Sequence, residues 1–338
     1  MILQRLIHIA AITLAIWLLV ACTQAPGEVH LSGRTMGTTY NIKYPAQPAI
    51  DPVALQSLID AELQLVNKLM STYDPQSELS VFNQTKSTEP QSLSDATLLV
   101  ISEALKIGEM SDGYLDITVG PLVNLWGFGP NAKPETIPTP QQVQDAHDIV
   151  GLDKLVTGDS TASKIHPDVY VDLSTVAKGY GVDQVALLLE QQGLADYLVE
   201  IGGEMRVAGK KANGSNWRIA IEKPVTLTRA VQRIVTIGDN AIATAGDYRN
   251  YFEENGVRYS HLIDPKTGYP INHRLVAATV VHPSSLVADG LATALVVMGK
   301  DKGLAMAERE GLSVLLITRE NNEFKEYTTA GFDQYLNN

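Results

Sequence analysis

Cysteine is almost absent from this chain of 338 residues, which contains only Cys22. A single thiol excludes a disulfide framework within one chain, and it excludes zinc or iron–sulfur sites that are built from several thiolates. Basic residues are also scarce, because 26 lysines and arginines stand against 38 acidic residues and give a formal net charge of −12. Since contacts to phosphate backbones need a basic face, we expect no nucleic-acid partner.

Three widespread nucleotide-binding and catalytic motifs are missing as well. The sequence has no GxxxxGK[ST] phosphate loop and no GxSxG nucleophile elbow, and Gly202-Gly203 lacks the spacing of a dinucleotide-binding GxGxxG. Apolar residues nevertheless make up 45% of the chain and charged residues 19%. These proportions are typical of a globular protein with a large core and not of a disordered or fibrous chain.

The first 22 residues have the pattern of a targeting segment. Arg5 supplies one positive charge, and Leu6–Val20 is almost wholly apolar, a length that suits a signal peptide better than a spanning helix of about 20 residues. The segment ends in Leu-Val-Ala-Cys22, which resembles a bacterial lipobox. We predict a signal peptide over 1–21, lipidation of Cys22 and a tether over 22–32. An ordinary signal peptide with a chance cysteine is the alternative.

The rest of the chain is predicted to alternate strands and helices without the rhythm of a parallel βαβ fold. Apolar stripes, caps and glycine or proline stops predict helices over 51–70, 93–110, 139–151, 174–192 and 286–298, with a long loop over 122–138. Strands are predicted over 29–44 as a pair, 169–171, 197–201, 217–222, 232–237, 258–264, 275–282 and 312–318. Consecutive strands with helices gathered elsewhere favour an α+β fold.

The most informative segment is the stretch from 283 to 299, where Asp289 is the only charged residue. Apolar residues surround it on nearly every side of the predicted helix, so the carboxylate should be buried and need a cation, a metal ion or several donors. Thr293 lies four residues on and shares its helix face. Their oxygens suit Mg²⁺, although Asp289 could instead complement the helix dipole while Thr293 bonds its own backbone.

A second segment, 170–180, is predicted to run from a short strand into the start of a helix. Asp172, Ser174 and Thr175 lie at this start, and Lys178 lies one turn further on. Because helix N-termini bind anions, the segment could hold a phosphate and leave a turn carbonyl free to ligate a metal. The alternative is a plain strand–helix junction in which Asp172 or Ser174 caps the helix.

A third segment, 260–268, ends in Asp-Pro-Lys-Thr-Gly, which is typical of a turn. His261 and Ile263 are predicted to share one face of the preceding strand. A histidine beside a metal–phosphate site could act as general base on a hydroxyl nucleophile. A histidine with a purely structural role in the strand is the alternative.

Seven motifs in one order make the chain resemble the ApbE family, the FAD:protein FMN transferases of bacterial envelopes, from about Gly33 to the C-terminus. The motifs are Arg34-Thr-Met-Gly-Thr38, Ser71-Thr-Tyr-Asp74, Asp116-Ile-Thr-Val-Gly-Pro-Leu122, Val171-Asp-Leu-Ser-Thr-Val-Ala-Lys-Gly-Tyr180, Ile201-Gly-Gly-Glu204, His261-Leu-Ile-Asp-Pro-Lys-Thr-Gly268 and Ala288-Asp-Gly-Leu-Ala-Thr293. The resemblance implies one transferase domain over 33–338, with mixed or antiparallel sheets, helices packed around them and two intimately joined lobes.

The resemblance also implies site residues, each at the position that matches the family's motif. An FAD site would be lined by Met36, Tyr73, Tyr114, Leu115, Asp116, Asp172, Lys178 and Ile263. Mg²⁺ would be held by Asp289, Thr293 and the backbone carbonyl of Thr175, and His261 would be the catalytic base. Two positions depart from the pattern: Ala292 stands where some relatives have a second carboxylate, and Tyr114 stands where relatives vary.

The activity implied is Mg²⁺-dependent transfer of FMN from FAD to a Thr or Ser of a target protein through a phosphoester bond, with release of AMP. The acceptors would be subunits of membrane redox pumps or similar flavinylated proteins. The implied location is the bacterial envelope, with a lipid anchor and the body facing the periplasm. The expected acceptors favour the inner membrane, but Thr23 stands where many inner-membrane lipoproteins have a retaining Asp, so the outer membrane is the alternative. The alternatives are an FAD pyrophosphatase, which uses water as acceptor, and a flavin-binding lipoprotein without turnover.

Overall fold

The computed structural model describes residues 27–130, 136–225, 230–248, 250–321 and 323–336. The predicted signal peptide and Cys22 lie outside these residues. Within them, no helix is both long enough and apolar enough to cross a membrane. The first strand already begins at Glu28, within the range that the sequence analysis gives to the tether.

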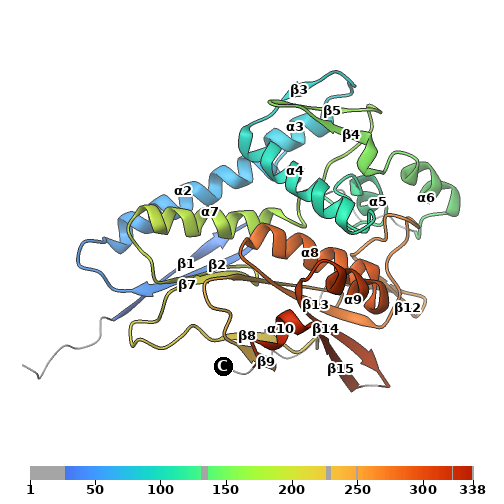
Figure 1. Ribbon diagram of the computed structural model, residues 1–338. Helices are drawn as coiled ribbons and strands as arrows, with labels where there is room; N and C mark the ends of the chain where they lie inside the picture. The colour runs from blue at the N-terminus through green and yellow to red at the C-terminus, as the bar shows by residue number, and fades with distance from the viewer. Residues whose placement is uncertain (1–26, 131–135, 226–229, 249, 322, 337–338) are drawn as a thin grey trace, which may run out of the picture.

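The larger lobe is built on an antiparallel sheet of eight strands (Figure 1). The strands in spatial order are β1 (Glu28–Thr35), β2 (Thr38–Pro45), β6 (Tyr197–Ile201), β7 (Glu204–Ala208), β10 (Ala241–Gly246), β13 (Leu275–His282), β14 (Ser313–Glu320) and β15 (Glu323–Thr328). Every ladder in this sheet is antiparallel. The α+β prediction is therefore confirmed.

Helices cover one face of this sheet, as Figure 1 shows. They are α2 (Pro52–Met70), α7 (Ala177–Gln191), α8 (Ser285–Met298) and α9 (Lys300–Arg309). The opposite face of the sheet is covered by a hairpin of β8 (Ile219–Glu222) and β9 (Val231–Val235) and by the short helix α10 (Ala330–Asp333). This second layer packs mainly on β7, β10, β13 and β14 and leaves β1 and β2 uncovered on that side.

A smaller lobe lies beside the helical layer. It comprises α3 (Glu78–Gln84), β3 (Gln91–Ser92), α4 (Asp95–Met110), α5 (Gly120–Leu125), α6 (Pro140–His147), the 3-10 helix η1 (Leu152–Lys154), β4 (Leu155–Thr157) and β5 (Thr161–Lys164). One apolar cluster joins it to the larger lobe, because Ile101 and Leu98 of α4 pack with Val176 and with Leu286 of α8. A hairpin of β11 (Tyr251–Glu254) and β12 (Val257–Ser260) packs aromatic side chains against α5.

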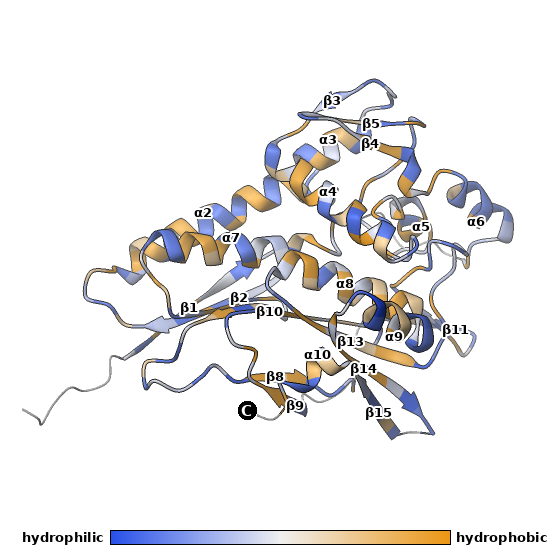
Figure 2. Cartoon of the chain, in the orientation of Figure 1, coloured by the Kyte–Doolittle hydropathy of each residue, from blue (hydrophilic) through white to orange (hydrophobic). Residues whose placement is uncertain are grey.

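Helix α8 lies at the centre of the molecule, where it contacts β10, β13, α4, α7 and α9. Figure 2 shows it as mostly hydrophobic, as its sequence predicts. Twelve of its 14 residues are buried. A helix in this position cannot move without disturbing the core, so any group that it carries is held rigidly.

Several predicted elements are confirmed with small shifts. Asp51 caps α2 through a hydrogen bond of 3.0 Å from the backbone N–H of Val53, and the strands over 197–201 and 275–282 have the predicted bounds. The predicted apolar stripe of α2 is wrong at two positions, because Val53 and Leu58 are exposed. They flank the side of α2 that packs on β1 and α7.

Other predictions are wrong, each for a local reason. The segment 122–138 is not all loop, because α5 extends to Leu125. The strand over 169–171 is a single bridge between Val119 and Tyr170, the third helix ends at His147, and β12 ends at Ser260, so His261 lies in a bend. Helix α7 begins at Ala177 and not at Ser174, with neither Asp172 nor Ser174 as its cap. Side-chain patterns locate these elements but do not fix where their backbone hydrogen bonds begin and end.

Candidate active site

A cavity of about 420 Å³ lies where the two lobes meet, with residues of both in its wall. Eleven of the twelve residues predicted for catalysis, FAD or metal line it. They are Tyr73, Tyr114, Leu115, Asp116, Asp172, Thr175, Lys178, His261, Ile263, Asp289 and Thr293. Segments that are nearly 220 residues apart in the chain thus converge on one cavity, which makes it the candidate active site.

Met36 is the one predicted residue that does not line the cavity. It occupies the turn between β1 and β2 with a positive φ of 47°, a conformation that costs free energy for a residue other than glycine. Its side chain points toward α7, where its Cε lies 2.8 Å from the position that a Cβ on Gly181 would take. The structure therefore places Met36 behind α7, half-buried against the apolar core of the larger lobe.

Lys178 lies between two buried carboxylates. Its Nζ is 3.4 Å from Oδ2 of Asp289 and 3.6 Å from Oε1 of Glu204, and both acids are only 4% exposed. The second oxygen of Glu204, Oε2, is buried without a hydrogen-bond partner among the described residues. Two buried carboxyl groups therefore share one ammonium, and ionisation of both would leave a deficit of positive charge at the cavity wall.

The pKa values of the three groups follow from this arrangement. Burial raises the pKa of Glu204 to about 8, against the opposing attraction of Lys178, and burial likewise raises the pKa of Asp289. Burial alone would lower the pKa of Lys178, but Asp289 and Glu204 raise it above its ordinary value. The ammonium is therefore charged at neutral pH, whereas burial disfavours the ionised form of both carboxyl groups, an effect that a nearby cation would oppose.

Asp289 also binds the N-terminus of α7. The backbone N–H of Gly179, in the first turn of α7, donates a hydrogen bond of 3.1 Å to Oδ2 of Asp289. This contact requires a close crossing of α7 and α8, because a Cβ at Gly179 would lie 2.3 Å from the carbonyl oxygen of Ser285. The glycine that follows Lys178 thus lets the two helices approach closely enough to share the carboxylate.

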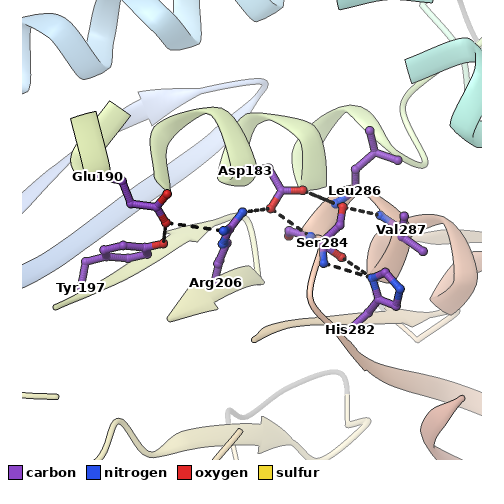
Figure 3. A network of polar contacts seen from close by, with 9 residues as sticks. Asp183, Glu190, Tyr197, Arg206, His282, Ser284, Leu286 and Val287 are labelled. Carbon is purple, nitrogen blue, oxygen red and sulfur yellow. Dashed lines mark hydrogen bonds and ion pairs between the residues drawn. The ribbon is translucent and has the colours of Figure 1, made fainter. Parts of the chain in front are cut away.

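A second carboxylate joins the same two helices in the opposite sense, since it belongs to α7 and binds the N-terminus of α8 (Figure 3). Asp183 of α7 accepts hydrogen bonds from the backbone N–H groups of Ser285 and Leu286, at 3.0 and 3.1 Å, and from the hydroxyl of Ser284 at 2.8 Å. These donors belong to the N-terminus of α8. Arg206 of β7 completes the site with an ion pair of 3.0 Å to Asp183. The first turn of each helix therefore donates backbone hydrogen bonds to an acid of the other.

His261 is held in one tautomer. Its Nδ1 lies 2.9 Å from the carbonyl oxygen of Asn250, and because a carbonyl can only accept, Nδ1 carries the proton and donates. Nε2 is left with its lone pair. Burial lowers the pKa of His261, and Lys178 and Arg258 lower it further. The ring packs edge-on against Phe128, another residue of the cavity wall, with centroids 6.3 Å apart. Position and charge state suit a general base.

Two other predicted acids hold the loops that line the cavity. Asp116 is buried and its Oδ1 accepts from the backbone N–H of Thr118 at 2.7 Å and from its hydroxyl at 2.6 Å. Burial raises the pKa of Asp116 against these hydrogen bonds. The backbone N–H of Asp172 donates 2.7 Å to the carbonyl oxygen of Ile117, so the loop before α7 and the loop after α4 form one wall.

Comparison with known proteins agrees with this geometry. The ApbE family matches residues 36–316. The chain belongs to the ApbE family. It is 53% identical over 320 residues to an FAD:protein FMN transferase of Vibrio cholerae, covering 94% of this chain and 96% of that protein. It is 48% identical over 322 residues to an FAD:protein FMN transferase of Haemophilus influenzae, with 93% of each chain covered.

Solved ApbE structures have the same fold. The flavin transferase ApbE from Vibrio cholerae superposes with a TM-score of 0.86 at 52% identity, covering 92% of this chain and 99% of that one. The apo form of the flavinyl transferase ApbE from Pseudomonas stutzeri superposes with a TM-score of 0.85 at 37% identity, covering 92% and 97%. The predicted family and its two-lobed α+β fold are confirmed.

The oxygen donors of this ApbE-family cavity suit a hard divalent cation. No group of three or more histidine, cysteine or acidic side chains with metal-ligand geometry occurs in the described residues, so a metal would rely on few protein charges. The Asp289 carboxylate, the Thr293 hydroxyl and the backbone around Thr175 all line the cavity. The unpartnered Glu204 oxygen and the shared ammonium leave negative charge that a cation would neutralise.

Sequence reasoning assigned no role to several residues that the ApbE-family cavity uses. Glu204 was noted only as part of a motif, although an acid directly after Gly202-Gly203 was a usable signal. Thr244 and Tyr248 belong to β10 and the loop after it, a region in which no strand was predicted. Asn250 acts through its carbonyl oxygen, a role for which the side chain gives no signal.

Proposed function

We propose that this protein is an FAD:protein FMN transferase, as its relatives are named. The observation that carries the proposal is the meeting, in one cavity, of a charged lysine, two buried acids and a histidine of fixed tautomer. Phosphoryl transfer depends on positioning and charge neutralisation more than on covalent chemistry by the protein, and these groups supply both.

We propose Mg²⁺ as the resident cation, held by the Asp289 carboxylate, the Thr293 hydroxyl and the carbonyl of Thr175. When bound, Mg²⁺ would neutralise the FAD phosphates and the leaving AMP. The ammonium of Lys178 carries positive charge to the same wall, and Asp289 and Glu204 keep it protonated. Tyr73, Tyr114, Leu115, Asp116, Asp172 and Ile263 would surround the rest of FAD, with Met36 supporting α7 from behind.

His261 would accept the proton of the acceptor hydroxyl at Nε2. A bond forms between that hydroxyl oxygen and the FMN phosphorus, the bond from this phosphorus to the bridging oxygen of the pyrophosphate breaks, and AMP leaves. The hydrogen bond from Nδ1 to Asn250 stabilises the ring in the orientation that presents Nε2. If water takes the place of the hydroxyl, the same groups would hydrolyse FAD to FMN and AMP.

One assay separates the candidate functions. The purified protein is incubated with FAD and MgCl₂, with and without the membrane proteins of its own bacterium in detergent. AMP release and covalent FMN on Ser or Thr peptides are then measured by chromatography and mass spectrometry. Covalent FMN with matching AMP supports the transferase; AMP alone indicates a pyrophosphatase; FAD binding without AMP indicates a flavin carrier. Membrane redox-pump subunits are the acceptors that we expect to find.

We further propose that Cys22 is lipidated and anchors the protein to the inner membrane, with the body in the periplasm. The support is the lipobox-like sequence that precedes the only cysteine of the chain. Cys22→Ser should release a soluble periplasmic protein that still transfers FMN in solution. Unchanged fractionation with membranes would contradict the lipid anchor. Loss of FMN transfer in solution would contradict the view that the anchor only localises the protein.

A further inference from the structure

A second groove, of about 540 Å³, adjoins the candidate active site from the opposite face of the main sheet. Thr39, Asn41 and Lys43 of β2 form part of its floor; they alternate with Tyr40, Ile42 and Tyr44, which face α2 and α7. The groove and the cavity share Gly202, Thr244 and Tyr248 in their walls. A path along the groove therefore leads past the β6–β7 turn to the cavity.

Strand β8 bounds the groove by its backbone edge. Five consecutive residues, 218–222, line it. Because successive side chains of a strand point to opposite faces, an unbroken run of lining residues means that the groove follows the edge of the strand and not one of its faces. Within the described part of the chain β8 pairs with β9 alone. Its other edge can therefore accept a further strand.

The turn between groove and cavity offers little obstruction. Gly202 and Gly203 have φ values of 61° and 110°, which residues with a Cβ adopt at a cost, so the turn carries no side chain. The groove also contains two basic side chains, Lys43 and Arg218, against two acidic ones, Glu200 and Glu222. In a chain of net charge −12, the groove thus has no excess of acidic side chains.

We propose that the groove binds an extended segment of the acceptor protein as an added strand along β8 and leads its Ser or Thr hydroxyl over the Gly202-Gly203 turn to His261. The inference rests on the proposed function, since only a group transfer to protein needs a second, polypeptide substrate at this cavity. FAD would fill the cavity between the lobes, so the acceptor would enter from this adjoining groove, where one edge of β8 pairs with no strand of the described residues. Backbone pairing would contribute affinity with little demand on the acceptor sequence.

The test narrows the groove from two sides. Ala220→Trp places a large side chain on β8, and Thr39→Trp places one on the floor from β2; both residues are exposed and lie outside the FAD cavity. Val231→Trp on β9 is the matched control, since Val231 is 58% exposed on the same hairpin and does not line the groove. The probe is the purified soluble domain of the protein that acquires FMN in the membrane-fraction assay.

Both groove variants should raise the KM for this acceptor domain by at least about tenfold, with the Kd for FAD and the AMP release without acceptor unchanged. The control should match wild type in all three measurements. Equal acceptor KM values in the groove variants and the control would overturn the inference, as would a loss of FAD affinity in both groove variants, which would make the groove part of the FAD site. Wild-type protein that transfers no FMN would refute the proposed function itself, a result distinct from either.

Discussion

Helices α7 and α8 cross so that each receives a carboxylate from the other, yet the two ends of the crossing differ in how well these acids are satisfied. Asp183 accepts three hydrogen bonds from the N-terminus of α8 and pairs with Arg206 (Figure 3). Asp289 accepts one backbone hydrogen bond and shares Lys178 with Glu204. At one end the carboxylate has all its partners within the protein. At the other end the carboxylate lacks partners, which a ligand in the cavity would supply.

The comparison separates stability from function within one pair of helices. A buried acid with all its partners holds the fold, whereas a buried acid with too few of them costs free energy that only a ligand offsets. Substitutions at the two ends should therefore have opposite effects on folding and on activity. The four predictions that follow test this contrast, from the largest expected effect to the smallest.

Asp289→Asn should lower FMN transfer by at least about 10³-fold, because the metal loses its one charged ligand and several kcal/mol of charge stabilisation. The free energy of unfolding without metal should stay the same or rise, since Lys178 then pairs with Glu204 alone. Steady-state transfer and urea unfolding in EDTA measure the two quantities. Full transfer at modest Mg²⁺ concentration would remove Asp289 from the site. Thr293→Val should have a smaller effect, because a neutral ligand carries less charge.

His261→Asn should lower kcat by roughly 10²–10⁴-fold, the usual range for loss of a general base, with little change in the Kd for FAD. The wild-type rate should rise with pH as His261 loses its proton. Because burial lowers the pKa of His261, this rise should lie below the ordinary value of about 6.5. A variant that binds FAD poorly but keeps its maximal rate would instead make His261 a binding residue, and a carboxylate such as Asp264 would be the next candidate.

Asp183→Ala should lower the free energy of unfolding by about 2–4 kcal/mol, because it removes the acceptor of the Ser285 and Leu286 backbone N–H groups and leaves Arg206 without its buried partner. Any protein that still folds should bind FAD and keep its pH–rate profile. Urea unfolding followed by circular dichroism measures the loss. Stability equal to that of wild type would show that water replaces the carboxylate at α8, and the contrast between the two ends of the crossing would fail.

Glu204→Gln should change how stability depends on pH. Burial holds the pKa of Glu204 at about 8, well above its ordinary value of 4.5, so between these pH values the native state binds a proton that the unfolded state has lost. Its contribution to stability is therefore present at pH 4.5 and below and is lost as pH rises toward 8. Glu204→Gln should remove this decline. Urea unfolding at several pH values in EDTA measures the free energy of unfolding of the variant and of wild type in parallel. An equal dependence of this free energy on pH in the two proteins would contradict a raised pKa of Glu204.

The sequence predicted the unsatisfied end of the crossing better than the satisfied one. Asp289 is conspicuous because no other charge occurs in its helix, and burial of that helix follows directly from its composition. Asp183 is not conspicuous, because an acid in an ordinary helix is expected to face solvent. Its hydrogen-bond donors belong to the start of a helix about 100 residues further on. The sequence around Asp183 gives no signal of these partners. Unusual local composition is visible in a sequence, whereas pairing across the fold is not.

The same limit explains the errors around the histidine. His261 and Ile263 alternate as strand residues do, but β12 ends at Ser260 because the chain turns to bring His261 beside Asn250. Strand β10 was missed since Ala-Ile-Ala-Thr-Ala-Gly lacks the large β-branched run of a typical strand, and only its neighbours β7 and β13 stabilise it. The residues of the cavity could be named, but the tautomer of His261 and the role of Glu204 required coordinates.

Gly179 has a further consequence for how the family can diversify. Since a Cβ there would lie 2.3 Å from the carbonyl oxygen of Ser285, the two helices cannot slide past each other or tolerate a larger residue at their crossing. The frame that holds Lys178 and Asp289 is thus closed to gradual change, whereas the exposed positions of β8, such as Ala220, carry no such constraint. We expect relatives that modify different proteins to diverge at the exposed positions of β8 and to keep the crossing, so new acceptors can be acquired without rebuilding the chemistry.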